Sequence, residues 1–453
     1  MAESTNTIQK EIQDREAKER RELRRKRRQR NQILAFLTFL LFVCLIVAII
    51  GTGVWYIMHR GAGKTTGGGA ATTEETTIDN LFESEDEIVK PEETNTEPSL
   101  TPEQQLDAIL DEAFISQMPL EDKVAGLFIV TPESITGVNK AVKAGDGTKD
   151  ALNKYAVGGI VYTSQNMQDA AQFTEMVSNT TLYSRYALFT CVAEEGGSST
   201  SLEKAGLADK TDSEQAMGTG ADAAKAYEAS GKIADSMLTY GLNLNFAPVA
   251  DLATVQDSYL KDASYGSDAA LAASFVTSAV QGMQEKGISS CLKYFPGAAD
   301  MKEDPATGMA SSERTAEQLA AEEFTVFKAG IDAGADMVMV GHVAVPALTG
   351  DNTPCSLSSA VVTDKLRNEL GFDGVIITDA MNKGAITEYY EADEAAILAL
   401  KAGCDMILCP DDFEKAYNGV LEAVQNGTIS EERINDSLRR IYRIKYASMM
   451  PEE

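Results

Sequence analysis

The sequence predicts an α/β chain whose main domain is a (β/α)8 TIM barrel, and three observations lead to that fold class. From residue 101 onward, short apolar runs alternate with longer helical patterns, which is the order of elements in a parallel α/β barrel. Eight such runs occur, and a final helical pattern follows the last of them. Several helical stretches end at a glycine, the usual residue just past a helix C-terminus.

The expected strands and helices cover the chain from residue 101 to its end as one domain, residues 101–453. The strands are expected at residues 125–130, 158–163, 187–193, 242–248, 288–294, 336–343, 374–378 and 405–409. Helices are expected at residues 166–183, 213–240, 267–286, 315–333, 358–370, 392–402 and 431–447. The runner-up is an open doubly wound sheet, but its glycine-rich dinucleotide loop is missing after the first strand.

A single transmembrane helix is expected before the barrel, at residues 31–58. This stretch contains no Asp, Glu, Lys or Arg and is long enough to span about 30 Å of hydrocarbon. Trp55 and Tyr56 suit its far interface, and the basic residues 1–30 precede it. Positive charge stays in the cytoplasm, so we expect a single-pass protein of the cell membrane with a cytoplasmic N-terminus and an extracellular barrel. A cleaved signal peptide would have a shorter apolar core and an Ala-x-Ala site.

Residues 59–100 form the expected flexible, disordered tether, because they are rich in Gly, Thr and acidic residues and poor in aromatic ones. The net charge of the chain is −29. The first 60 residues carry 12 Lys and Arg against 6 Asp and Glu, so all of the negative excess lies in the remainder. A strongly acidic body argues against nucleic-acid binding.

The six cysteines indicate neither a disulfide framework nor a zinc site. Cys44 lies in the expected anchor, and the other five are an odd number without a CxxC pair. Most of those five fall in or beside apolar strand-like runs, where a free thiol behaves as a small hydrophobe. The sequence therefore implies no metal and no cofactor.

Charged and polar residues end several of the expected strands. Asp379 follows the β-branched run Val375-Ile-Ile-Thr378, and Glu195, Asp251, Lys293 and His342 end other strands. In a barrel these ends meet at one mouth, where the chemistry of such folds takes place. A carboxylate at a strand end can be a nucleophile, a metal ligand or a helix N-cap, and the spacing alone leaves all three open.

Residues 101–448 resemble glycoside hydrolase family 3, in its β-N-acetylhexosaminidase branch. The matching segments occur in the order of that family across all eight strands. They include Glu195-Gly-Gly197, Asn245-Phe-Ala-Pro-Val-Ala-Asp251, Lys293-Tyr-Phe-Pro-Gly297, Gly341-His-Val343 and the run from Leu366 to Asp379. The resemblance implies that Asp379 is the nucleophile of a retaining reaction. It also implies that substrate is bound by Lys293, His342, Asp251, Glu195 and Met381.

The acid/base loop of the family is altered in this chain. The family pattern after the fifth strand contains an Asp two residues before the acid/base His. Here Asp304 keeps the place of the Asp, and Ala306 stands in the place of the His. Because the chain has only two His residues, no other imidazole can take the role. The carboxylates Asp304 and Glu303 on this loop are the candidate replacement acids, if burial raises the pKa.

Residues that hold the sugar in the family are also replaced. Ala193, Ser198, Ala263 and Tyr294 stand where the family has Asp, Arg, Arg and His. The resemblance therefore implies an extracellular, membrane-anchored enzyme that hydrolyses O-glycosyl bonds of amino sugars with impaired activity. Its partners are a carbohydrate or cell-wall glycan and the membrane. The alternative is a catalytically inactive barrel that serves as an extracellular glycan-binding or scaffold domain. An intracellular barrel enzyme for phosphorylated substrates conflicts with the anchor and the acidic body.

Overall fold

The computed structural model describes residues 106, 109–110, 114–197, 200–297 and 299–447, all within one compact unit, Asn95–Glu453. In this part of the chain no helix has the length and apolar character needed to cross a bilayer. The expected basic tail, anchor and tether, residues 1–100, lie outside the described residues.

The predicted barrel is confirmed. Eight parallel strands close in sequence order, and the last strand pairs with the first through Phe128 and Ile407. The strands are β1 (Phe128–Val130), β2 (Gly159–Val161), β3 (Phe189–Val192), β4 (Leu244–Asn245), β5 (Ser289–Phe295), β6 (Met337–Val340), β7 (Val375–Ala380) and β8 (Met406–Leu408). Most of their residues are buried, as expected of strands covered on both faces.

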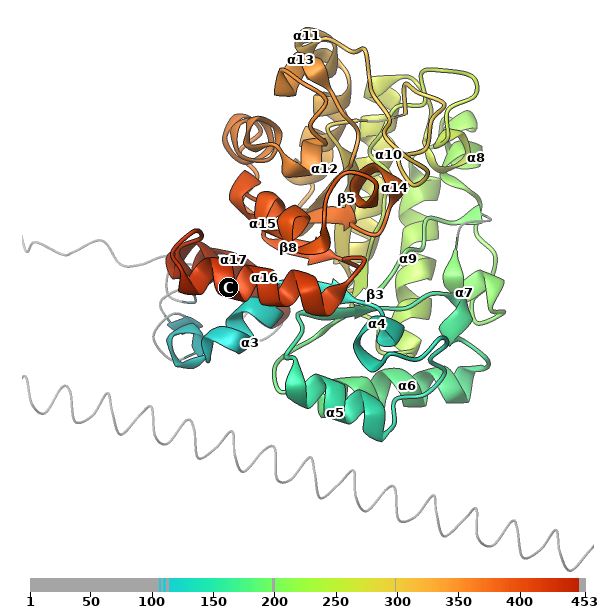
Figure 1. Ribbon diagram of the computed structural model, residues 1–453. Helices are drawn as coiled ribbons and strands as arrows, with labels where there is room; N and C mark the ends of the chain where they lie inside the picture. The colour runs from blue at the N-terminus through green and yellow to red at the C-terminus, as the bar shows by residue number, and fades with distance from the viewer. Residues whose placement is uncertain (1–105, 107–108, 111–113, 198–199, 298, 448–453) are drawn as a thin grey trace, which may run out of the picture. The chain divides into compact units, whose positions relative to one another are not determined.

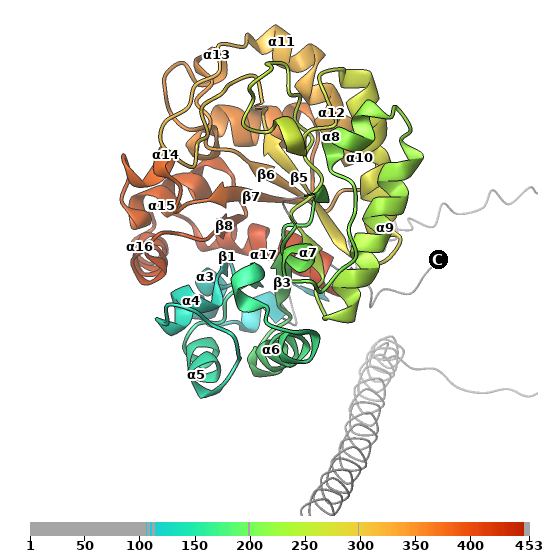
Figure 2. The same cartoon turned by 90° about the vertical axis from the view of Figure 1, so that its right-hand side faces the viewer.

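Helices surround the strands as a ring (Figures 1 and 2). The longer ones are α5 (Asp146–Lys154), α6 (Ala170–Tyr183), α9 (Ala224–Thr239), α10 (Ala269–Gln284), α12 (Glu323–Asp332), the π-helix η7 (Ala360–Glu369), α15 (Ala392–Ala402), α16 (Phe413–Gln425) and α17 (Glu431–Tyr446). Shorter helices are α3 (Leu120–Ala125), α4 (Pro132–Thr136), α7 (Ser201–Lys204), α8 (Glu214–Thr219), α11 (Ala316–Ala321), α13 (Pro346–Thr349) and α14 (Gly384–Thr387). Side chains at the N-caps fix where several helices begin; for example, Asp169 accepts the Gln172 N–H at 2.9 Å.

Two expected helices are each divided in the structure. The expected helix at 213–240 is α8 followed by α9, with Ala221 at φ +52° in the break. Such a backbone angle ends a right-handed helix, and the apolar pattern of the sequence does not reveal it. The expected helix at 315–333 is α11 followed by α12, which meet at Glu322.

A buried ion cluster ties the N-terminal end of the barrel together. The carboxylate of Asp405, just before β8, accepts hydrogen bonds from Arg367 Nη2 at 2.7 Å, Ser437 Oγ at 2.8 Å and the Ile376 N–H at 2.9 Å. Arg440 Nη1 lies 3.3 Å from the same carboxylate. The cluster therefore joins η7, β7, β8 and α17.

Lys445 of α17 places a charged group in an apolar setting at the same end. Its Nζ is buried, lies 4.7 Å from the ring centroid of Phe189 and 4.8 Å from that of Tyr442, and makes no hydrogen bond to the described residues. Burial lowers the pKa of the Lys445 ammonium to about 7.

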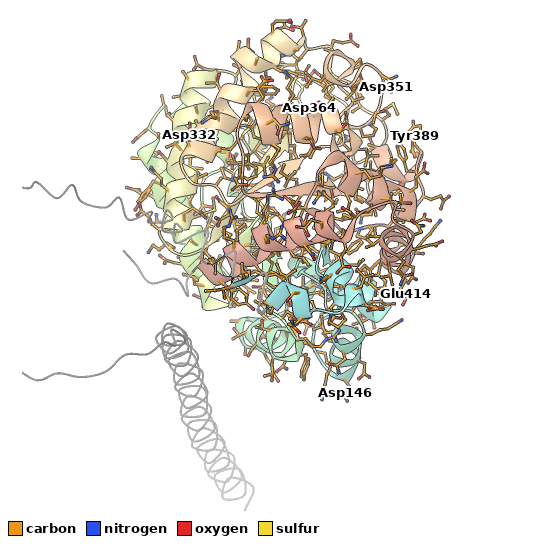
Figure 3. All side chains as sticks on the ribbon, turned by 90° about the vertical axis from the view of Figure 1, so that its left-hand side faces the viewer. Asp146, Asp332, Asp351, Asp364, Tyr389 and Glu414 are labelled. Carbon is orange, nitrogen blue, oxygen red and sulfur yellow. The ribbon has the colours of Figure 1, made fainter. Side chains whose placement is uncertain are left out.

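The outer surface carries many acidic side chains. Asp146, Asp332, Asp351, Asp364 and Glu414 lie at the periphery of the molecule (Figure 3). This distribution accords with the low pI of about 4.5.

Candidate active site

The carboxyl ends of the strands carry the predicted site residues. Asp379 is the next-to-last residue of β7, and Lys293 lies near the end of β5. His342 follows β6, Asp251 follows β4, and Glu195 follows β3. Because all eight strands are parallel, these residues share one rim of the barrel.

Asp379 has both carboxylate oxygens occupied. Its Oδ1 accepts the N–H of Ala380 at 2.7 Å, and its Oδ2 accepts Lys383 Nζ at 2.6 Å. Burial acts to raise the pKa of Asp379, but the Lys383 ammonium, together with these hydrogen bonds, outweighs burial and holds the pKa below its usual value. Asp379 is therefore an ionised carboxylate at the end of a rigid strand, as a nucleophile requires.

Lys293 and Glu195 form a second buried ion pair at the mouth. The Lys293 side chain is 2% exposed, and that of Glu195 is 11% exposed. Burial acts to lower the pKa of Lys293, but the Glu195 carboxylate outweighs it and keeps the pKa above its usual value. Glu214 lies close by, accepts the Val249 N–H at 3.1 Å, and has a pKa that burial raises well above the usual range.

Glu194, next to Glu195, supports the structure. Its Oε1 accepts the backbone N–H groups of Ser201 at 2.7 Å and Leu202 at 2.9 Å, at the first turn of α7. Burial raises the pKa of Glu194 to about 7. Adjacent carboxylates at the end of β3 thus face different surroundings, and of the two only Glu195 pairs with Lys293.

His342 holds the turn that follows Asp379. Its Nε2 lies 3.0 Å from the carbonyl oxygen of Ala380, and its Nδ1 lies 2.8 Å from Ser356 Oγ. Because a carbonyl only accepts, Nε2 carries the proton, and the Ser356 hydroxyl donates to Nδ1. Burial lowers the pKa of His342, so the ring is neutral and positions Ala380 beside Asp379.

Asp251 connects the β4 exit to the loop after β5. Its Oδ1 accepts the N–H groups of Leu252 at 3.1 Å and Ala299 at 3.2 Å. Gly297, at the start of this loop, has φ +123°, and a Cβ there would lie 2.6 Å from Glu323 Cγ. The loop can leave the barrel along this path only with glycine at that position.

The loop after β5 is docked on the turn after β7. The N–H groups of Gly384 and Ala385 each donate at 3.0 Å, to the carbonyl oxygens of Ala306 and Pro305 respectively. Asp304 Oδ1 accepts the Ala306 N–H at 2.8 Å, which closes a local turn. A Cβ at position 384 would lie 2.8 Å from the backbone of the loop, so glycine permits this contact.

The candidate acids differ in exposure. Glu303 is exposed and Asp304 is half-buried, while Ala306, at the position of the missing histidine, is exposed. The structure therefore brings the altered acid/base loop to the side of the mouth that carries Asp379.

Lys383 was not among the residues predicted for the site. It pairs with Asp379 across a spacing of four residues, and its ammonium lies 5.3 Å from the ring centroid of Tyr294. The ammonium of Lys293 lies 5.4 Å from the same centroid. Opposite charges four residues apart are a recognisable signal within a helix, but here Asp379 lies at the end of β7 and Lys383 in the turn after it.

Met381 lines a neighbouring cavity of about 270 Å³ between the segments that follow β7 and β8. Its side chain is buried, and Tyr390, Pro410 and Lys415 contribute to the same cavity. The Met381 N–H donates to the carbonyl oxygen of Leu408 at 2.9 Å. Ser198, one of the replaced sugar-binding positions, lies outside the described residues.

The described residues contain no group of three or more His, Cys, Asp and Glu side chains placed to bind a metal. Five cysteines, from Cys191 to Cys409, are free thiols in this part of the chain. Burial raises the pKa of these thiols, so they are poor nucleophiles.

Comparison with known proteins supports the barrel. The model of the glycosyl hydrolase family 3 N-terminal domain matches residues 119–444. A β-hexosaminidase of Stenotrophomonas maltophilia (strain R551-3) is 30% identical over 284 residues, which cover 60% of this chain and 82% of that protein.

Two solved structures show the same architecture. A glycoside hydrolase family 3 β-N-acetylglucosaminidase from Paenibacillus sp. str. FPU-7 has a TM-score of 0.69 and 32% identity, over 74% of this chain. This chain spans 64% of that protein. A β-N-acetylhexosaminidase from Beutenbergia cavernae DSM 12333 has a TM-score of 0.65 and 26% identity, over 73% of this chain and 99% of its own. The chain therefore belongs to glycoside hydrolase family 3, in its β-N-acetylhexosaminidase branch, through its N-terminal barrel domain.

Proposed function

We propose that this protein is a membrane-anchored extracellular glycosidase that hydrolyses the O-glycosidic bonds of β-linked amino sugars, with Asp379 as its nucleophile. The observation that carries this proposal is the state of Asp379. It is a buried but ionised carboxylate, fixed at the end of β7, in the barrel of a family whose relatives include β-hexosaminidases.

The reaction proceeds in two steps with retention of configuration. Asp379 attacks the anomeric carbon as the leaving-group oxygen departs, and water then releases the sugar from the resulting ester. The Ala380 N–H holds one carboxylate oxygen, and His342 fixes Ala380 through its carbonyl group. The nucleophile therefore approaches the sugar from a defined direction, which lowers the entropic part of the barrier.

We further propose that turnover is slower than in relatives that keep the acid/base histidine. Ala306 carries no proton, and Ala193, Ala263 and Tyr294 no longer offer the charged or imidazole groups of the family. Each lost hydrogen bond to a sugar removes about 1 kcal/mol or more. Substrates with good leaving groups need little protonation, so they should react best.

A specific observation favours a second candidate function, a non-catalytic glycan-binding or scaffold domain. Asp379 pairs with Lys383, and Lys293 pairs with Glu195, so the charges at the mouth are compensated without a ligand. Buried charges that are already paired do not need a substrate to compensate them.

One assay separates the two candidates. The full-length protein in detergent is incubated with an aryl N-acetyl-β-glucosaminide that releases a nitrophenol. Slow release that Asp379→Asn abolishes supports the glycosidase. Asp364→Asn, on the exposed face of η7, is the control and should leave the rate unchanged. Glycan binding without any release supports the second candidate, and release that persists in Asp379→Asn refutes the role of this residue.

The proposed anchoring rests on the apolar stretch 31–58 and the basic residues before it. Protease added to intact cells should digest the acidic barrel and spare the N-terminal tail. A barrel that is protected in intact cells but digested after lysis would contradict the proposed orientation.

A further inference from the structure

The reaction proposed above needs a group that protonates the leaving oxygen and later accepts a proton from water. Two candidates near Asp379 are held by other groups. His342 has both ring nitrogens engaged, with Ser356 and with the Ala380 carbonyl. Lys293 is buried and paired with Glu195. Neither is placed to exchange a proton with a substrate.

Lys383 differs from both in position and access. Its Nζ lies 2.6 Å from Asp379 Oδ2, and its side chain is 25% exposed, whereas that of Lys293 is 2% exposed. Lys383 immediately precedes α14, and its flexible four-carbon stem lets the ammonium move while the backbone stays fixed. The Tyr294 ring, 5.3 Å away, supports the cation in this position.

We propose that Lys383 is the acid/base residue of this site, in place of the histidine that Ala306 has replaced. The proposal rests on the glycosidase function proposed above. In the first step the Asp379–C1 bond forms, the C1–O bond breaks, and the Lys383 ammonium gives its proton to the departing oxygen. In the second step water attacks C1, the Asp379 ester bond breaks, and the Lys383 amine takes the proton of the water. The ion pair between Lys383 and Asp379 is then restored.

The ion pair couples the proton transfer to the nucleophilic attack. In the resting site burial acts to lower the pKa of Lys383, but Asp379 and Tyr294 outweigh it and raise the pKa to about 12. When Asp379 becomes a neutral ester, its share of this stabilisation disappears while the burial of the ammonium remains. The ammonium therefore becomes a stronger acid as the leaving oxygen needs a proton, and the resulting amine is the base of the second step.

A leaving-group series tests this assignment in the full-length protein. The rates of aryl N-acetyl-β-glucosaminides, from the dinitrophenyl to the unsubstituted phenyl glycoside, are compared between the wild type and Lys383→Ala. General acid catalysis contributes about 10²–10⁴-fold. We expect a loss of that order for the phenyl glycoside and little loss in the glycosylation of the enzyme by the dinitrophenyl glycoside. Added azide should restore the turnover of the dinitrophenyl glycoside by Lys383→Ala and yield a glycosyl azide.

Two further variants keep the test sharp. Lys383→Arg retains the positive charge beside Asp379 but does not release a proton, because guanidinium stays protonated in proteins. Lys383→Arg should therefore hydrolyse the phenyl glycoside as slowly as Lys383→Ala does. Lys365→Ala is the matched control, because Lys365 also pairs four residues along the chain, with Glu369 at 2.6 Å, on the surface of η7. It should behave as the wild type.

Three results would overturn the assignment. A loss in Lys383→Ala that is equal for all leaving groups, without azide rescue, would leave Lys383 a positioning residue only. A selective loss of rate on the phenyl glycoside, with azide rescue, in Asp304→Asn but not in Lys383→Ala would show that the loop carboxylate is the proton donor. A wild-type protein that releases no phenol from any glycoside would refute the proposed function itself, and this inference with it.

Discussion

In a protein that lacks the Lys383 amine (Lys383→Ala), replacing Ala306 with histidine should return a proton donor to the loop after β5 and accelerate the hydrolysis of glycosides with poor leaving groups. The backbone at this position is held on both sides. The Ala306 carbonyl oxygen accepts the Gly384 N–H at 3.0 Å, and its N–H donates to Asp304 Oδ1 at 2.8 Å. The side chain at 306 is exposed, so an imidazole fits there without displacing the core.

The size of the gain follows from two opposing contributions. A positioned general acid contributes about 10²–10⁴-fold, which is about 2.7–5.4 kcal/mol of activation free energy. To orient the new imidazole, Asp304 must loosen its hydrogen bond to the Ala306 N–H, at a cost of about 1 kcal/mol. We therefore expect kcat/KM for the phenyl glycoside to rise about ten- to a thousandfold, and that for the dinitrophenyl glycoside to change little.

Steady-state kinetics over the leaving-group series measure this gain, and the pH profile identifies its origin. A histidine that acts as the acid must be protonated, so kcat/KM should fall as the pH rises through the ordinary histidine pKa of about 6.5. Thr307→His places the same ring one residue further along the exposed loop and serves as the matched control. An unchanged rate for the phenyl glycoside in Ala306→His, or an equal gain in Thr307→His, would refute the reasoning.

Three other outcomes are expected. The pKa of Lys445 is about 7 in the folded protein and 10.5 in the unfolded chain. Between these two pH values the unfolded chain binds more protons than the folded one, so the free energy of unfolding increases with pH. Lys445→Met should therefore raise the free energy of unfolding in urea by about 3–5 kcal/mol at pH 6 and by little near pH 10; a gain that does not depend on pH would contradict this. Asp405→Asn should cost about 3–5 kcal/mol in the same assay, because it leaves half-buried arginines without their buried counter-charge, whereas Asp373→Asn in an exposed pair should cost less than about 1 kcal/mol. Because Lys383 lowers the pKa of Asp379, the acidic limb of kcat/KM should move to higher pH in Lys383→Ala and stay in place in Lys383→Arg; a limb that stays in place in both would exclude this electrostatic coupling.

The sequence was sufficient to predict the barrel because each strand is a short apolar run between turn residues. All eight expected strands contain or overlap an observed one. Their lengths were less predictable. The expected strand 242–248 contains only the two residues of β4, and Pro248 near its end has no N–H to donate to a neighbouring strand.

The position of the mouth was also predictable from the sequence. Charged side chains that directly follow buried strands are unusual, and the parallel topology brings them to one end of the barrel. Glu195, Asp251, Lys293, His342 and Asp379 all lie at that rim. Which charges pair was not predictable, because the pairing of Lys293 with Glu195 joins β5 to the β3 exit through side-chain conformations that a linear pattern does not contain. Whether these residues act on a sugar stays a prediction that the kinetic assays address.

The absence of a histidine at position 294 affects the surroundings of Lys383. In the family pattern a histidine stands at position 294, where this chain has a tyrosine. An imidazole there can itself carry charge, and two ammonium groups beside it would repel that charge. The neutral Tyr294 ring instead lies 5.4 Å from the ammonium of Lys293 and 5.3 Å from that of Lys383, and it favours both through its π-face. The loss of an imidazole at 294 therefore makes room for a cation beside Asp379. Since the residues at 383 and 384 also adjoin the loop that carries Ala306, positions 294, 306 and 383 all bear on the surroundings of Asp379.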